Sequence, residues 1–267
     1  MEAESAEKDP VLVLHEPPLG WLVLNRPEVR NALNLRAWRR IAEGLDELEA
    51  DAQVRVIIIR GANDEAFIAG ADISEFPRLR ADTDQARSYE KAPARVVTAI
   101  VAAKKPVIAM IAGFCLGGGV QVALACDLRF AARGTRLGIP AARLGLVYPP
   151  EAVRMLTQTV GPANARDLLL SGRDIDADEA WAMGLVNRVI ERSELEAHTR
   201  EYALRLARNA PLTMAAAKHT VAFVCGLRNA PDSEQIEEEM WRSFDSEDFH
   251  EGVRAFLEKR RPIFTGR

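Results

Sequence analysis

Apolar positions in the first part of the chain follow two spacings. Short apolar runs bounded by glycine, proline or charged residues predict strands, and apolar residues three or four positions apart predict helices. Runs at residues 11–14 and 21–24 flank a Pro-Pro-Leu-Gly turn and predict a hairpin. Further strands are expected over 54–59, 106–111 and 128–132, and helices over 35–49, around 96–101 and directly after the glycines at 117–119.

From residue 151 onward the pattern is mostly helical. Helices are predicted over 151–160, 163–170, 177–183, 193–208, 212–225 and 233–243. Strands that feed helices, followed by helices alone, predict an α/β core over residues 1–194 and a helical C-terminal region over residues 195–267.

Composition narrows the class of protein. With 267 residues, 48% of them hydrophobic and 28% charged, the chain can bury a substantial core. The net charge of −4 argues against a general nucleic-acid surface. No apolar run approaches the roughly 20 residues that cross a bilayer. The first ten residues are acidic and lack the apolar stretch of a signal peptide, so we expect a cytoplasmic protein.

The three cysteines give no sign of a metal or disulfide framework. Cys115, Cys126 and Cys225 are odd in number, stand among apolar residues and lack metal-ligand spacing. We therefore expect buried, reduced thiols, and neither a metal nor a nicotinamide cofactor has support in the sequence.

The most informative segment is the glycine triplet Gly117–Gly119, which lies between a predicted strand and an Ala/Leu-rich helical run. Glycines here leave backbone N–H groups unshielded at a helix N-terminus. Two interpretations stay open on this evidence: a tight turn that packs helix on sheet, or a site that binds an anionic oxygen.

A second segment of the same kind lies upstream, Ala66-Phe-Ile-Ala-Gly-Ala-Asp-Ile73, after the strand predicted at 54–59. Two glycine-linked segments at strand ends can converge on one oxygen atom. With these residues the chain resembles the enoyl-CoA hydratase/isomerase family, the crotonase superfamily. The order and spacing of further motifs extend the resemblance over nearly the whole chain: 25–27, 31–33, 105–109, 125–127, 144–145, 170–173, 177–180, 184–186 and 256–259.

The resemblance implies a crotonase-like spiral of ββα turns with C-terminal helices that build a trimer, often paired into a hexamer. It places the N–H groups of Ala71 and Gly118 around the thioester oxygen of an acyl-CoA, where they stabilise an enolate. Coenzyme A is then part of the substrate, and no separate cofactor is expected.

The sequence departs from the family at its reaction-specific positions. Hydratases that it resembles carry one glutamate two residues past the glycine triplet and another twenty residues later; here these positions hold Gln121 and Ala141. Paired carboxylates do acid–base work that an amide and a methyl group cannot. We therefore expect isomerase, decarboxylase or atypical hydratase chemistry, with Tyr148 and Glu151 as further candidate catalytic residues. Glu151 is equally typical of a first helical turn.

Other candidates are structural or concern coenzyme A. Asp72 is expected to cap a short helix. The resemblance assigns coenzyme A contacts to Arg30, Ala69, Phe256 and Lys259, while two lysines of the family are replaced by Glu28 and Ser74. The expected partners are an acyl-CoA thioester and further copies of the chain, without nucleic acid or membrane. The alternative to an enzyme is a catalytically silent acyl-CoA-binding protein.

Overall fold

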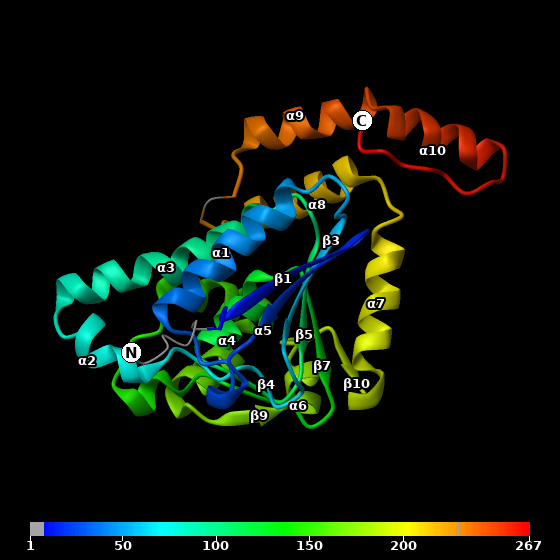
Figure 1. Cartoon of the computed structure of the whole chain (residues 1–267). Coiled ribbons are helices and arrows are strands. Elements are labelled where there is room, and N and C mark those ends of the chain that lie inside the picture. Colours follow the sequence, from blue (N-terminus) through cyan, green and yellow to red (C-terminus); the bar gives the residue numbers. More distant parts are fainter. Residues whose placement is uncertain (1–7, 229) are drawn as a thin grey trace, which may run out of the picture.

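The computed structural model describes residues 8–228 and 230–267. Two sheets organise the fold (Figure 1). The larger has six strands in the order β1-β2-β3-β5-β7-β10, and the smaller has four in the order β4-β6-β8-β9. The strands of the larger sheet are β1 (Val11–Glu16), β2 (Leu19–Leu24), β3 (Val56–Gly61), β5 (Val107–Ile111), β7 (Leu128–Ala132) and β10 (Arg188–Ile190). Those of the smaller sheet are β4 (Ala66–Ile68), β6 (Phe114–Leu116), β8 (Arg136–Gly138) and β9 (Asp174–Asp176).

Helices alternate with these strands and then dominate the C-terminal part, which confirms the predicted fold class. They are α1 (Leu35–Ala50), α2 (Phe76–Leu79), α3 (Thr83–Ala102), α4 (Gly118–Ala125), α5 (Pro150–Ser171), α6 (Ala177–Ala182), α7 (Leu195–Leu206), α8 (Pro211–Val224), α9 (Ser233–Phe244) and α10 (Glu247–Leu257). Short 3₁₀ helices cover Pro27–Val29, Ile73–Glu75, Pro140–Leu144 and Arg192–Glu194. The two helices predicted over 151–160 and 163–170 are both present within α5, which is interrupted at Gly161, where φ is 77° and ψ is 162° and the backbone is not helical.

A ββα unit repeats three times in the core. In each unit the first strand joins the larger sheet and the second joins the smaller one, as in β3–β4–α3, β5–β6–α4 and β7–β8–α5. The predicted hairpin is confirmed, with Val11 opposite Leu24 and Glu16 opposite Leu19. It joins the larger sheet through β2, which pairs in parallel with β3.

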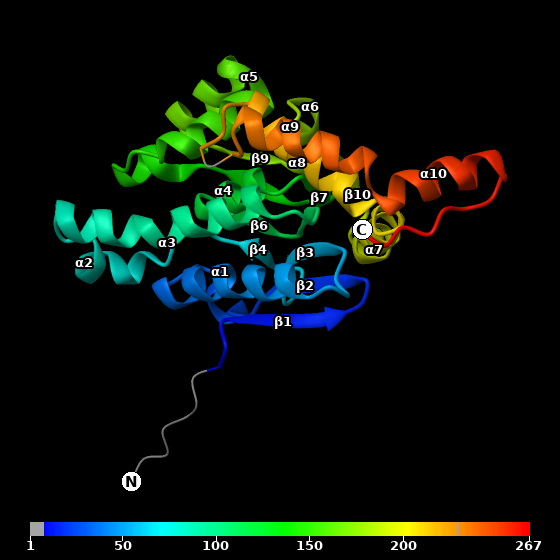
Figure 2. The same cartoon turned by 90° about the horizontal axis from the view of Figure 1, so that it is seen from above.

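Both faces of the larger sheet are covered, because side chains along a strand point alternately to opposite faces. Ile57 and Ile59 of β3 lie in a buried cluster with residues of α1, α3, α4 and α5. Ile58, between them, lies in a second cluster with Leu195 and Ala203 of α7. Figure 2 shows α1 and α7 on different sides of the strands. Burial on both faces explains why the sequences of these strands are continuous apolar runs.

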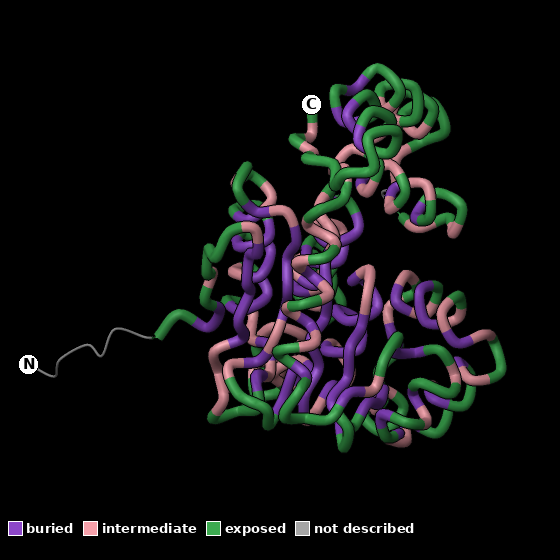
Figure 3. Tube along the Cα trace, turned by 90° about the vertical axis from the view of Figure 1, so that its right-hand side faces the viewer, coloured by how far each residue is buried: buried purple, intermediate pink, exposed green. Residues whose placement is uncertain are grey.

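The helices α9 and α10 lie apart from this core, at the opposite end of the molecule from β4 and β9 in Figure 1. Figure 3 shows a buried interior in the body of the molecule and mostly exposed or half-buried residues in these two helices. The predicted boundary after residue 194 falls directly before α7, and the division into two regions stays a prediction. Across the described residues, no helix combines the length and the apolarity that membrane crossing requires.

Candidate active site

Two glycine-containing segments meet beside the smaller sheet. The strands β4 and β6 pair in parallel, so the residues that follow them leave the sheet at the same edge. A Cβ atom added to Gly117 would lie 4.0 Å from the Cα of Gly70, and one added to Gly118 would lie 3.6 Å from the nitrogen of Ala71. Gly70 and Gly117 have φ angles of 121° and 50°, which only glycine adopts without strain.

The N–H groups of Ala71 and Gly118 lie at this junction. Neither donates to any acceptor in the part of the chain that the structure describes. Gly118 is the first residue of α4, where an N–H has no intrahelical partner, and the helix dipole favours negative charge there. Two unpaired donors are thus available for one oxygen.

Each of these N–H groups belongs to a peptide unit whose carbonyl oxygen accepts one or more hydrogen bonds. The carbonyl oxygen of Gly70 accepts from Leu33 N at 2.8 Å, and that of Gly117 accepts from Tyr148 Oη at 2.9 Å and from Gln121 N at 3.1 Å. Because a peptide unit is planar, fixing its carbonyl also fixes the direction of the N–H at its other end. Both donors are therefore preorganised.

The loop before α1 supports the first of these segments. Asn31 is buried, and its side-chain amide donates to Ala66 O at 2.8 Å. Arg30 O accepts from Ala69 N at 3.1 Å, and Leu33 O accepts from Asp72 N at 2.9 Å. The residues around Asn31 that contributed to the family resemblance thus hold the backbone of residues 66–72 in place.

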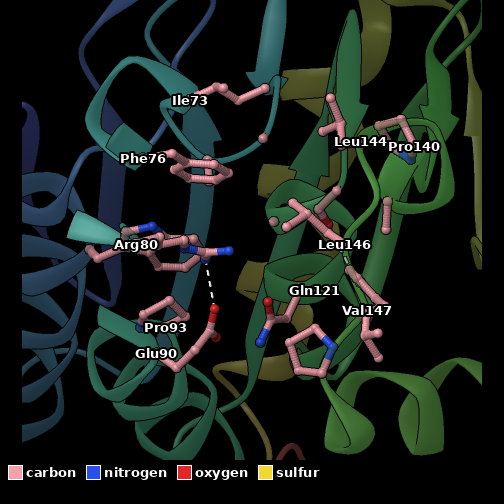
Figure 4. A pocket seen from close by; sticks show the side chains of 18 of the residues that line it. Ile73, Phe76, Arg80, Glu90, Pro93, Gln121, Pro140, Leu144, Leu146 and Val147 are labelled. Atoms are coloured by element: carbon pink, nitrogen blue, oxygen red, sulfur yellow. Dashed lines mark hydrogen bonds and ion pairs between the residues drawn. The ribbon is translucent and has the colours of Figure 1, made fainter. Parts of the chain in front are cut away.

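A mainly apolar pocket of about 130 Å³ opens above the two donors. One wall comes from the segment after β4, α2 and α3, and the other from α4 and the loop between β8 and α5 (Figure 4). Phe76 and Val147 line it with apolar side chains, whereas Leu79 packs against the core. The lining residues are Trp38, Ala69, Gly70, Ala71, Ile73, Phe76, Arg80, Glu90, Pro93, Gly117, Gly118, Gln121, Pro140, Ala141, Leu144, Leu146, Val147, Tyr148 and Pro149.

The two positions at which the resemblance leads us to expect glutamates both line this pocket. Gln121 lies in α4 and is buried, and Ala141 lies in the 3₁₀ helix after β8. The strand β8 lies beside β6 in the smaller sheet, which brings the second position to the same edge as the first. The pocket therefore carries an amide and a methyl group at these two positions.

Tyr148 lines the pocket and is buried. Burial, with a smaller effect of the nearby Cys115, raises the pKa of its phenol above the ordinary value. The phenol is therefore a hydrogen-bond donor at neutral pH, and its proton goes to Gly117 O.

Glu151 does not line the pocket. Its Oε1 accepts from Arg228 N at 2.8 Å, and its Oε2 pairs with Arg154 at 3.5 Å. It stands in the first turn of α5, where a carboxylate suits the helix dipole. The structure thus gives Glu151 the structural role that the sequence left open and does not bring it to the other candidates.

Asp72 caps the 3₁₀ helix Ile73–Glu75, as predicted, by accepting from Ser74 N at 3.2 Å. Partial burial opposes the charge, but hydrogen bonds from Ser74 and Arg26 outweigh it and hold the pKa of this carboxyl below its ordinary value. Asp72 thus anchors the segment that carries the Ala71 N–H.

The sequence interpretation missed a polar pair in the pocket wall. Arg80 Nη2 lies 2.7 Å from Glu90 Oε1 (Figure 4). Neither residue belongs to a recognisable motif. The only signal was the placement of charged residues on the amphipathic helix α3, where Tyr89 and Pro93 are buried and Glu90 is half-buried.

Comparison with known proteins now decides the family. A model of the enoyl-CoA hydratase/isomerase family matches residues 19–267. The chain belongs to the enoyl-CoA hydratase/isomerase family. This confirms the resemblance found in the sequence.

Individual members of the family match along nearly their whole length. A short-chain-enoyl-CoA hydratase of Clostridium acetobutylicum is 34% identical over 257 residues, which cover 96% of this chain and 97% of that protein. A 2,3-dehydroadipyl-CoA hydratase of Escherichia coli is 36% identical, covering 92% and 94%. A crystal structure of an enoyl-CoA hydratase/carnithine racemase from Magnetospirillum magneticum has a TM-score of 0.91 and 38% identity, covering 98% and 97%.

Of the positions expected to bind coenzyme A, only Ala69 lines the pocket. Arg30 is exposed, and its guanidinium carbon lies 4.8 Å from the centre of the Phe114 ring. Phe256 and Lys259 belong to α10 and the turn after it, and the Phe256 side chain is 82% exposed. These side chains do not reach the pocket of their own chain.

Cys115 and Cys126 are buried and Cys225 is half-buried, all three as free thiols. Burial raises the pKa of Cys126 to about 12, which makes it a poor nucleophile. Among the described residues, no cluster of three His, Cys, Asp or Glu side chains could hold a metal ion.

Proposed function

We propose that the chain is an acyl-CoA-processing enzyme that stabilises a thioester enolate between the N–H groups of Ala71 and Gly118. The observation that carries this proposal is the meeting of two unpaired, preorganised donors at the base of an apolar pocket. Donors aimed at an oxygen that becomes negative lower the barrier, and one such donor is worth roughly 3–4 kcal/mol. The thioester carbonyl of an acyl-CoA is the substrate group that the family relationship supplies.

Tyr148 has a defined part in this proposal. Its hydroxyl holds the carbonyl of the peptide unit that ends in the Gly118 N–H. Tyr148 is therefore a positioning residue for the oxyanion hole, and its bond to Gly117 leaves no second phenolic proton to give to a substrate.

The reaction follows from the residues that face the acyl group. Because Gln121 and Ala141 replace the two glutamates, hydration by paired carboxylates lacks its acid and base. We propose isomerisation, decarboxylation or an atypical hydration, each of which passes through the enolate that the two N–H groups stabilise. The hydratase names of the relatives support an acyl-CoA substrate for this chain, not a particular reaction.

The same replacement supports a second candidate function, a catalytically silent acyl-CoA-binding protein. Such a protein would use the pocket and the N–H groups for binding alone. The two candidates differ in one measurable property, because only the enzyme releases a changed acyl-CoA.

We also propose a homotrimer or hexamer in which α10 brings Phe256 and Lys259 to the coenzyme A portion bound by a neighbouring subunit. The helices α9 and α10 leave large apolar side chains exposed, and contiguous apolar surface of this kind marks protein interfaces. These side chains are Met240, Trp241, Phe244, Phe249, Val253, Phe256 and Leu257.

A turnover screen tests the proposed function. Purified protein is incubated with crotonyl-CoA, a 3-enoyl-CoA and methylmalonyl-CoA, products are followed by mass spectrometry, and thermal shift is measured with the same compounds. We expect a product from at least one of them. Stabilisation by all three without any product would overturn the enzyme in favour of the binding protein.

A further inference from the structure

The pocket of this protein retains one carboxylate, although both family glutamates are replaced. Among the described residues that line the pocket, Glu90 is the only Asp or Glu. It projects from α3, the wall opposite α4, and its side chain remains 42% exposed. Glu90 thus lies in the pocket at a position that the resemblance did not assign.

The orientation of Glu90 is set by Arg80. Besides its 2.7 Å ion pair with Glu90, the Arg80 guanidinium lies over two aromatic rings, at 4.3 Å from the centre of Phe76 and 4.4 Å from that of Tyr89. Stacking on two rings restricts a guanidinium that would otherwise sample many rotamers. Arg80 is therefore held in place, and it aligns the Glu90 carboxylate in turn.

Across the pocket, Gln121 presents its amide toward Glu90 (Figure 4). Gln121 lies one turn into α4, the helix whose first N–H belongs to the oxyanion hole. An amide donates and accepts hydrogen bonds but takes up no proton at neutral pH, whereas a carboxylate does. The capacity for proton transfer thus lies on the α3 wall.

We propose that Glu90 is the proton-transfer residue of this pocket and that Arg80 is its positioning residue. This inference rests on the proposed function, since it requires an acyl thioester whose oxygen occupies the site between Ala71 N and Gly118 N. It also selects a substrate class. One carboxylate that takes and returns the same proton suits the shift of a double bond within a 3-enoyl thioester.

The step balances without any further reactant. The Glu90 carboxylate takes the proton from C2 of the 3-enoyl thioester. The electrons of the broken C–H bond form a C1–C2 double bond, and the carbonyl π electrons move to the oxygen held by Ala71 and Gly118. The enolate oxygen of the resulting dienolate then re-forms the carbonyl, the C1–C2 π electrons become the C2–C3 double bond, and the C3–C4 π electrons form the new C–H bond at C4 with the proton that Glu90 returns. The product is the 2-enoyl thioester, and Glu90 is again a carboxylate.

The test separates proton transfer from the hole itself. Exchange of the C2 protons of butyryl-CoA in D₂O reports enolate formation without requiring a complete reaction. We expect exchange by the unchanged protein and a loss of about 100-fold or more in Glu90→Gln. Binding of butyryl-CoA, followed by calorimetry, should stay within a few-fold. Asp84→Asn, an exposed carboxylate change on the same helix, is the matched control and should retain exchange.

The experiment distinguishes failure of the Glu90 inference from failure of the proposed function. If Glu90→Gln exchanges the C2 protons as fast as the unchanged protein, Glu90 is not the base and this inference is wrong, while the proposed function stands. If the unchanged protein neither exchanges nor turns over any thioester, the proposed function and this inference both fail.

The test of Arg80 must measure a quantity that would not change if Arg80 only stabilised the fold. In Arg80→Met, the Glu90 carboxylate loses the cation that aligns it, so kcat for exchange should fall about tenfold while KM changes little, and Arg80→Lys should partly restore kcat. An unchanged kcat in a folded Arg80→Met protein, or no recovery of kcat in Arg80→Lys, would contradict the positioning role. This variant also keeps the Glu90 inference testable if Glu90→Gln fails to fold.

Discussion

Removal of one hydroxyl group tests the role proposed for Tyr148. In Tyr148→Phe, Gly117 O loses its 2.9 Å bond from Tyr148 but keeps the 3.1 Å bond from Gln121 N. No buried carbonyl is left unpaired, so the free energy of unfolding should fall by only about 1 kcal/mol.

The rate should fall for a different reason. Without the phenol, the Gly117–Gly118 peptide unit has one hydrogen bond fewer, and the orientation of the Gly118 N–H is less restricted. A full oxyanion-hole donor is worth roughly 3–4 kcal/mol. Loss of about 1.4 kcal/mol of that value corresponds to a roughly tenfold slower reaction.

The assay is the C2 proton exchange of butyryl-CoA in D₂O, measured as a function of its concentration. We expect kcat to fall and KM to change little, because this hydrogen bond orients a donor to the developing enolate. Tyr202→Phe on α7 is a suitable control, since its ring packs against Phe130 and lies outside the pocket lining. An exchange rate for Tyr148→Phe within twofold of the unchanged protein, or a rise in KM alone, would refute the reasoning.

Three further predictions concern the rest of the chain. Glu151→Gln keeps an oxygen that can accept from Arg228 N, so C2 proton exchange should persist. The free energy of unfolding, measured by thermal unfolding, should fall by no more than about 1 kcal/mol. Loss of exchange would make Glu151 a catalytic candidate again. Hydrogen bonds from Arg260, Arg254 and Ile263 N hold the pKa of Glu251 below its ordinary value of 4.5, so its stabilising effect is present above that pH and is lost as the pH falls below it. The difference in melting temperature between the unchanged protein and Glu251→Gln should therefore shrink from about pH 6 to about pH 3, and a constant difference would contradict this. Light scattering should give three or six times the chain mass of 29.4 kDa, and a monomer at micromolar concentration would contradict the proposed assembly.

Elements with long apolar runs were predictable from the sequence. The hairpin of β1 and β2, the helix α1 and the step from β5 to α4 are all found where the pattern predicts them. The strands of the smaller sheet were not all predictable, because each has three residues and three residues show no period. Their pairing is what brings Ala71 and Gly118 together. The two glycine-linked segments suggested that such a convergence was possible, and the resemblance supplied the two N–H groups.

The candidate acid–base residues show most clearly what sequence motifs cannot predict. Glu151 is near the motifs in sequence, yet its hydrogen-bond partner Arg228 lies 77 residues away and the pair is structural. Glu90 lies within a helix of ordinary polar pattern, and its place in the pocket depends on how α3 packs across from α4. A carboxylate that enters a site from a neighbouring helix leaves no local signal in the sequence.

The central claim is that the N–H groups of Ala71 and Gly118 stabilise an enolate. The most direct measurement compares the C2 proton exchange of butyryl-CoA by the unchanged protein and by Gly118→Ala. The added Cβ would lie 3.0 Å from Trp38 Cζ2 and 3.6 Å from Ala71 N, so it disturbs the two-donor site. We predict exchange by the unchanged protein and a fall of about 100-fold in the variant, the value of one oxyanion-hole donor. Equal rates in a folded Gly118→Ala protein, or no exchange by either protein, would contradict the account.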